Sequence, residues 1–283
     1  MRPAVVRSAP QMAASAPARV VVWFRNDLRL HDNPLLERAR TCGASEVVPC
    51  YIFDPRTYAE SKFGSPKTAA HRARFIHQSV SDLCSRLSGV GSGLLIGVGR
   101  PEDLLPSLCH VDGGTTFMWQ EQRTTEELRV ESAVRAALAQ ASTDTSVHTS
   151  LSGELLERAD LPFGIRDMPN VFTPWRNAVE KACTPPKPLS PPAKGSLPLP
   201  PNTADLATAA WVGWEGLPES GPYHPCKNAD EPSENADAPT GVLDFVGGET
   251  SALNRVQHYI WDADCLKDYF TTRNGMHAAW QSP

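Results

Sequence analysis

The hydrophobic positions of the first 150 residues follow two alternating patterns. Five short apolar runs are rich in β-branched or aromatic residues, which is typical of buried strands. Between the runs, apolar residues recur every three to four positions, which indicates amphipathic helices. This alternation predicts βαβ units and a parallel sheet covered on both faces. The predicted strands are Val20–Phe24, Glu46–Phe53, Leu94–Val98, Thr115–Trp119 and Ser146–Thr149.

Local signals mark the starts of the helices. Asp32 or Asn33 is suited to cap a helix that begins at Pro34. Residues 67–88 form the longest predicted helix, with an inner face of Phe75, Ile76, Val80, Leu83 and Leu87. The predicted fold class is α/β, with a doubly wound five-stranded parallel sheet and Val20–Phe24 as its central strand.

The composition changes after residue 183. A helix over residues 171–182, with Val171, Phe172, Trp175 and Val179 on one face, completes a predicted domain over residues 19–183. The stretch from Thr184 to Gly241 holds 13 of the 26 prolines, so residues 184–246 are interpreted as a mobile, irregular linker, with Trp211 or Trp214 as an anchor. Residues 247–283 are predicted to begin a second, all-helical domain, with an apolar stripe of Leu253, Val256, Tyr259 and Ile260.

Composition narrows the classes of function. The net charge of −5 gives no bulk attraction to nucleic acid, and no apolar run is long enough to span a membrane. Seven scattered cysteines without a CxxC pair favour a reducing compartment and no metal site. Residues 1–18 contain two arginines and no acid, which suits a chloroplast or mitochondrial transit peptide or a disordered tail. Without such targeting we expect the cytoplasm or nucleus, and not secretion.

Residues 21–36 carry the sharpest motif, V-V-W-F-R-N-D-L-R-L-H-D-N-P-L-L. A strand here ends in a charged loop at the carboxyl edge of the sheet, where ligands of α/β folds bind. The structural interpretation is that Arg25, Asp27 and Arg29 pair with one another and fix the loop. The glycine-rich fingerprints for dinucleotides and nucleoside triphosphates are absent from the sequence.

The whole motif closely resembles the opening of photolyases and cryptochromes. Residues 69–75, A-A-H-R-A-R-F, resemble that family's helix after its second strand. Residues 167–180, D-M-P-N-V-F-T-P-W-R-N-A-V-E, look like a segment of its DASH branch. Residues 247–276, which begin G-G-E-T-S-A-L and end R-N-G-M, look like the start of that branch's flavin domain. All four segments occur in the family's order.

The resemblance implies FAD as cofactor and light-driven electron transfer that splits pyrimidine dimers, mainly in single-stranded DNA. By resemblance, Tyr269 matches a tyrosine that approaches the flavin and Arg273 an arginine at the DNA-facing mouth. Gln122, with Glu121 beside it, stands where many relatives have a glutamate that binds a methenyl folate antenna. A monomer is expected, and no catalytic residue is assigned. Most of the family's flavin pocket follows the R-N-G-M segment, so we expect this chain alone to be inactive.

Two other functions remain open at this point. The first is a non-catalytic antenna-type or interaction module that has only the α/β domain, which leaves enzymatic activity undecided. The second is an adenine-nucleotide-binding or electron-transfer flavoprotein-like domain. The second lacks a glycine-rich phosphate loop and leaves residues 247–276 unexplained.

Overall fold

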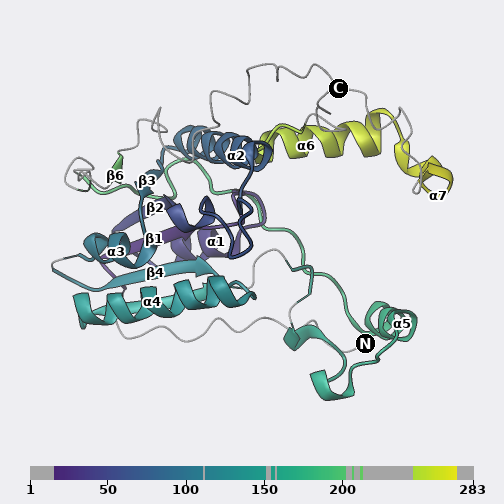
Figure 1. Ribbon diagram of the computed structural model, residues 1–283, viewed down its shortest axis with the longest axis horizontal. Coiled ribbons are helices and arrows are strands. Elements are labelled where there is room, and N and C mark those ends of the chain that lie inside the picture. The colour runs from purple at the N-terminus through teal and green to yellow at the C-terminus, as the bar shows by residue number, and fades with distance from the viewer. Residues whose placement is uncertain are drawn as a thin grey trace.

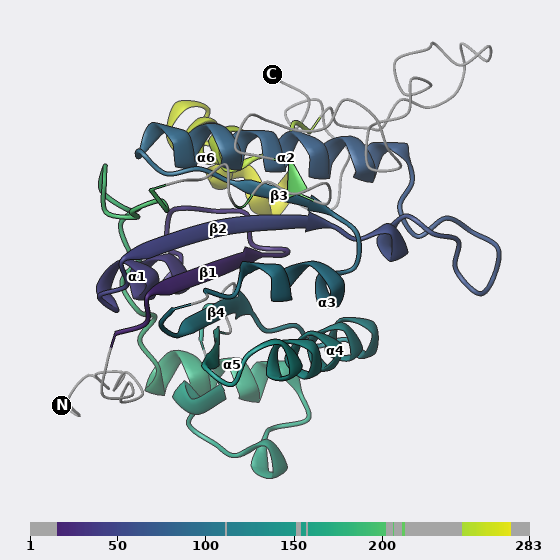
Figure 2. The ribbon, with the colours of Figure 1, turned by 90° about the vertical axis from the view of Figure 1, so that its left-hand side faces the viewer.

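The α/β domain is a three-layer sandwich with a twisted sheet in the middle (Figures 1 and 2). The computed structural model describes residues 16–110, 112–150, 154–156, 158–201, 206, 211–212 and 245–272. The strands are β1 (Arg19–Phe24), β2 (Glu46–Phe53), β3 (Leu95–Val98), β4 (Thr115–Gln120), β5 (Thr145–Ser150) and β6 (Trp211–Val212).

The sheet has the order β5-β4-β1-β2-β3-β6. Its first five strands pair in parallel, and β1 lies between β2 and β4, so the predicted five-stranded doubly wound sheet and its central strand are confirmed. Every residue of β1 is buried, as expected for a strand covered on both faces. Because the chain runs from β1 to β2 on one side and later to β4 on the other, the connections diverge at the carboxyl end of β1, where α/β folds bind ligands.

Helices cover both faces of this sheet. Helices α1 (Pro34–Thr41) and α2 (Ala70–Gly89) pack on one face, and α3 (Pro101–Leu104) and α4 (Thr125–Ala141) pack on the other. Two separate apolar cores result, because successive residues of β1 point to opposite faces. Short 3₁₀ turns lie at Pro55–Thr57, Leu105–Leu108, Arg158–Asp160, Ile165–Asp167 and Cys265–Asp268.

The start of α1 shows how the sequence fixes the loop after β1. The Asn33 side chain accepts hydrogen bonds from the amides of Leu35 and Leu36, at 3.0 and 3.2 Å, so Asn33 is the predicted cap. Pro34 occupies the first turn, where its missing amide hydrogen costs nothing. Asp32 instead adopts a positive φ of 53° and accepts from the Leu189 amide through its side chain.

Part of the proline-rich segment packs against the α/β domain. The Pro198 carbonyl accepts from the amide of Val47, which pairs with Val20 of β1 but precedes the first β2–β3 pair and so has no partner in β3. Leu197 is fully buried in the core beside α2. Trp211 is the predicted anchor: it lies in the short antiparallel strand β6, and its indole nitrogen donates to Ser107 at 3.0 Å. Trp214 lies outside the described residues, and the linker boundaries stay a prediction.

Two helical pieces extend from the domain on the same side of the molecule (Figure 1). Helix α5 (Phe172–Ala182) buries Val179, whereas Phe172 is 67% exposed. The second piece comprises α6 (Glu249–Gln257), a π-helical turn (His258–Asp262) and α7 (Tyr269–Thr272). Within the described residues, no helix combines the length and hydropathy needed to cross a bilayer.

Candidate functional site

Charged side chains gather at the carboxyl ends of β1, β2 and β4. Arg25 follows β1 and is almost fully buried, with its guanidinium 4.7 Å from the centre of the Trp23 ring. It pairs with Glu131 of α4 and also donates to the Gln120 carbonyl at 3.2 Å. Burial lowers the pKa of Arg25, and the hydrogen bond and charge of Glu131 oppose that shift. Arg25 therefore joins β1 to α4 across the edge of the sheet.

The expected pairing within the loop holds for only two of its three charged residues. Arg29 makes two bonds to the Asp27 carboxylate, at 2.8 and 3.1 Å. This hydrogen bonding raises the pKa of Arg29. Arg25 takes no part in this pair, because its side chain turns inward to Glu131. The loop is thus fixed by one local pair and one long-range pair.

The two predicted antenna residues lie in the loop between β4 and α4. Gln122 accepts from the Asn26 side chain at 2.7 Å, and its backbone amide donates to Glu131 at 3.0 Å. The Glu121 amide continues the β4–β5 pairing by donating to Ser150 at 2.9 Å. Both residues are partly exposed, and neither lines the two clefts described next. Asn26 lines both clefts, so Gln122 stands at their border.

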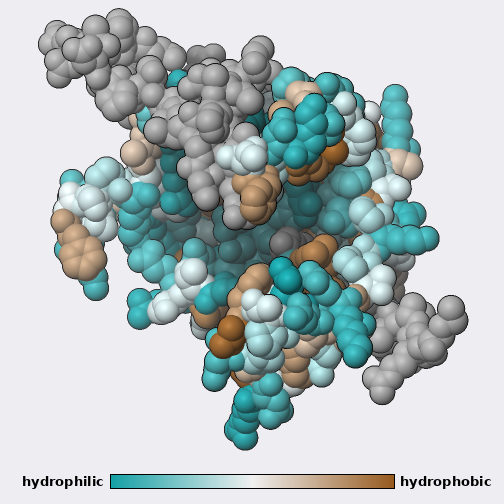
Figure 3. Space-filling view, turned by 90° about the vertical axis from the view of Figure 1, so that its right-hand side faces the viewer, coloured by the Kyte–Doolittle hydropathy of each residue, from teal (hydrophilic) through white to brown (hydrophobic). Residues whose placement is uncertain are grey.

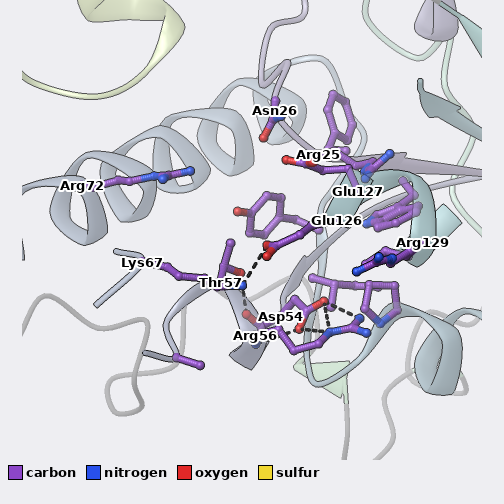
Figure 4. Close-up of a pocket in the computed structure, with 17 residues that line it drawn as sticks. Arg25, Asn26, Asp54, Arg56, Thr57, Lys67, Arg72, Glu126, Glu127 and Arg129 are labelled. Carbon is purple, nitrogen blue, oxygen red and sulfur yellow. Dashed lines mark hydrogen bonds and ion pairs between the residues drawn. The ribbon is translucent and has the colours of Figure 1, made fainter. Parts of the chain in front are cut away.

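A cleft of about 480 Å³ opens above the ends of β1 and β2, between α2 and α4 (Figure 4). Trp23, Phe24 and Tyr51 supply its aromatic surface. Arg72 of α2 and Arg129 of α4 lie on opposite sides of it (Figure 4), and neither forms a hydrogen bond or ion pair with the described part of the chain. Aromatic surface beside unpaired guanidinium groups is suited to a planar, anionic ligand.

Ion pairs fix Arg56 and Lys67 at this cleft, whereas Glu127, which also lines it, has one buried carboxylate oxygen without a hydrogen-bond partner. Arg56 binds Asp54 and Glu102 together, with nitrogen–oxygen distances of 2.6 and 2.9 Å. Lys67 reaches across to Glu126 on α4 at 2.8 Å, and this bond lowers the pKa of Glu126 (Figure 4). These pairs leave Arg72, Arg129 and Glu127 as charged lining residues without an ion pair in the described part of the chain.

A second cleft of about 380 Å³ adjoins the first and shares six lining residues with it, including Arg25, Asn26 and Arg72. Its far wall is formed by Gly248, Glu249 and Ala252 at the start of α6. The two clefts make one groove along the carboxyl edge of the sheet, and we call it the edge groove. Phe75, expected in the core, is 46% exposed because it lies near the start of α2, where it lines the second cleft.

The residues matched to the flavin and DNA sites lie elsewhere. Tyr269 is half-exposed on α7 and lines neither cleft. Arg273 lies outside the described residues. The roles of Tyr269 at a flavin and of Arg273 at DNA stay predictions. No cluster of three or more metal-ligating side chains occurs in the described parts.

Sequence reasoning missed the edge groove and the buried carboxylates that frame it. Trp23 and Phe24 were assigned only as strand residues, yet as the last residues of β1 they also reach the ligand edge. Glu131 lies on the inner side of α4, where a charged residue breaks the apolar pattern. That break was the available signal, because a buried acid requires a partner.

Comparisons with known proteins identify the family. The sequence model of the DNA photolyase family matches residues 20–193. Cryptochrome DASH of Natronomonas pharaonis is 38% identical over 260 residues, which cover 92% of this chain and 50% of that protein. Cryptochrome DASH, chloroplastic/mitochondrial, of Ostreococcus tauri is 34% identical over 278 residues, with coverages of 91% and 50%.

Solved structures agree with this result. The Synechocystis sp. PCC6803 cryptochrome superposes with a TM-score of 0.72 at 32% identity, covering 93% of this chain and 50% of that one. A class III photolyase from Agrobacterium tumefaciens gives a TM-score of 0.62 at 25% identity, with coverages of 95% and 48%. The chain spans about half the length of the relatives it matches. The chain therefore belongs to the DNA photolyase/cryptochrome family and is similar to its DASH members.

Proposed function

We propose that this chain is the light-harvesting half of a DASH-type protein that uses FAD and light to repair pyrimidine dimers, mainly in single-stranded DNA. The family and the order of its segments support this proposal. A dimer in an unpaired strand needs the least energy to leave the base stack, which suits a single-strand preference; photolyases are among the enzymes known to flip bases. The repair step itself needs a bound flavin.

The edge groove is the observation that carries the light-harvesting part of the proposal. Trp23, Phe24 and Tyr51 offer flat apolar surface, and Arg72 and Arg129 offer positive charge without an internal partner. These features fit a methenyl folate, which has a planar pterin and anionic glutamate. When bound, such a group absorbs near-ultraviolet light and passes the energy to a flavin. The chain's part is to hold the pterin, exclude water and pair with the carboxylates.

Gln122 and Glu121 contribute at the border of the groove in this proposal. In the structure the Gln122 amide is bonded to Asn26 and Gln120, so a pterin would exchange one of these bonds for its own. Glutamine accepts a hydrogen bond less strongly than a carboxylate does, so we expect folate to bind more weakly than it would to a glutamate at this position. Replacing Gln122 with glutamate is therefore expected to raise the affinity.

Titration of the purified chain with methenyltetrahydrofolate tests the groove. The expected result is saturable quenching of tryptophan fluorescence, which is smaller in a Trp23→Phe variant that still binds folate by absorbance after desalting. Arg72→Ala with Arg129→Ala is expected to weaken binding at least tenfold, whereas the matched change Arg166→Ala, on an exposed turn away from the groove, leaves it unchanged. Equal affinity of the wild type and the double variant would contradict the groove assignment.

FAD provides the second arm of the experiment. We expect the chain alone to lose added FAD on desalting and to leave pyrimidine dimers in a single-stranded oligonucleotide intact under light, because Tyr269 is half-exposed and unenclosed. Stoichiometric retained flavin, or light-dependent loss of dimers, would overturn this expectation. The alternative function, a non-catalytic antenna or interaction module, predicts folate binding without any gain of repair when the rest of a DASH-type sequence is joined to the chain.

A further inference from the structure

Glu249 is a charged residue buried where α6 meets the α/β domain. Glu249 is the first residue of α6, and its side chain is 3% exposed. It contacts the β1–α1 loop, which lies more than 200 residues earlier in the chain. One carboxylate oxygen accepts from the Leu30 amide at 2.8 Å, and the other accepts from the His31 amide at 2.9 Å. Arg86 of α2 forms an ion pair with the same carboxylate at 2.9 Å. Three groups of the α/β domain thus surround a single anion.

The two residues before Glu249 allow this approach because they lack side chains. A Cβ on Gly247 would lie 2.1 Å from the Phe75 carbonyl oxygen of α2. A Cβ on Gly248 would lie 2.6 Å from Asp82, and the φ of +116° at Gly248 is itself unfavourable for other residues. The backbone of the segment therefore contacts α2 at a distance that only glycine permits.

Further hydrogen bonds join the same two elements. The Gly247 amide donates to the Gln78 side chain at 2.9 Å, and the Thr250 amide donates to Asp82 at 3.1 Å. Asp82 therefore accepts from one of the first amides of α6, which otherwise lack an intrahelical partner. The contact combines a matched anion site, a close backbone approach and satisfied helix-end amides, which distinguishes it from loose packing.

We propose that the β1–α1 loop and the outer face of α2 form a docking site for a carboxylate-bearing Gly-Gly-Glu segment, and that residues 247–249 occupy it to hold α6 on the α/β domain. Two consecutive backbone amides beside a guanidinium form an anion-binding concavity. The site also positions one wall of the edge groove, because Gly248, Glu249 and Ala252 line the second cleft.

Amide hydrogen exchange of the full chain tests the docking site. In Glu249→Gln, the amides of Leu30 and His31 and those of α6 are expected to exchange faster together, by about 10- to 100-fold, because a charge-assisted acceptor is lost. Amides of β1 and β2 should keep their protection and serve as the internal reference. The matched control Glu180→Gln changes an exposed glutamate on α5 and should leave both segments unchanged.

Gly248→Ala supplies an independent variant, since it blocks the backbone approach and keeps the carboxylate. It should accelerate exchange in the same two segments, again without loss of protection in β1 and β2. The proposal is overturned if neither variant changes the exchange of the loop or of α6. It is also overturned if α6 alone responds while Leu30 and His31 stay protected, or if both variants unfold the central strands, because the contact would then not be a separable docking site.

Discussion

Glu131 and Glu249 show how single buried acids organise this chain. Both residues are 5% exposed, and each carboxylate binds one arginine together with backbone amides, one at Glu131 and two at Glu249. Glu131 holds Arg25 and the Gln122 amide, so it fixes the loop at the border of the edge groove. Burial of a charge is tolerated only where partners replace the lost water, which is the case at both positions.

Replacing Glu131 with leucine leaves the buried Arg25 guanidinium without its partner. We expect the free energy of unfolding to fall by about 3–5 kcal/mol, measured by urea denaturation. The double variant Arg25→Leu with Glu131→Leu should recover much of this loss, because it leaves no unpaired charge in the protein interior. Arg176→Ala, at an exposed ion pair on α5, should change stability by less than about 1 kcal/mol. A single Glu131→Leu variant as stable as this control would contradict the assigned role.

At the scale of elements, part of the proline-rich segment forms an edge strand of the sheet. Strand β6 lies antiparallel to β3, with Trp211 opposite Gly97. Edge strands expose unpaired backbone groups that favour unwanted association, and β6 covers this edge of β3 in part. Gly97 leaves the space that the Trp211 ring occupies, so the small residue of β3 and the large residue of β6 are complementary.

Gly97→Ala tests this complementarity. A Cβ at position 97 would lie 2.8 Å from the Trp211 ring and 2.9 Å from Leu104. We expect a loss of about 1–3 kcal/mol in unfolding free energy, together with a change in the fluorescence of the displaced tryptophan. Gly89→Ala is the matched control, since nothing lies within 4 Å of its Cβ and alanine favours the helix end of α2. The explanation fails if Gly97→Ala and Gly89→Ala have the same midpoint of urea denaturation.

At the scale of the whole molecule, apolar side chains lie on α5 and on α6–α7, which extend to the same side (Figure 1). Viewed from that side, hydrophobic groups flank a central hollow (Figure 3). Val171 and Phe172 of the α5 piece and Leu253, Val256 and Phe270 of the second piece are each at least 45% exposed. Surface of this kind marks an interaction site or a tendency to self-associate.

A double variant, Leu253→Glu with Val256→Lys, measures the effect of this surface. It is expected to bind less of the dye ANS and to self-associate less in sedimentation velocity, because the exposed stripe of α6 becomes charged. Leu128→Glu is the control, as Leu128 is 46% exposed on α4 and stands apart from both helical pieces. If the control lowers dye binding as much as the double variant does, the α6 stripe is not the responsible surface.

The sequence by itself determined the layers of this protein. Strand and helix follow from local spacing, and Asn33 caps α1 through atoms only two or three residues away. A five-stranded parallel sheet follows because strands that alternate with helices form βαβ units. The four characteristic segments, residues 21–36, 69–75, 167–180 and 247–276, indicate the family without any tertiary information. Such features depend on neighbours along the chain, so periodicity and motif are sufficient to predict them.

The tertiary structure alone decided which distant groups meet. Arg25 had Asp27 and Arg29 nearby in sequence, yet it pairs with Glu131, 106 residues away. Glu249 contacts amides 218 and 219 residues earlier, and the edge groove joins residues from β1, β2, α2 and α4. No local pattern specifies these pairs, because they depend on how twisted strands and helices pack in three dimensions. Burial then selects the partner, since a charge removed from water must bind whichever opposite group the fold brings within reach.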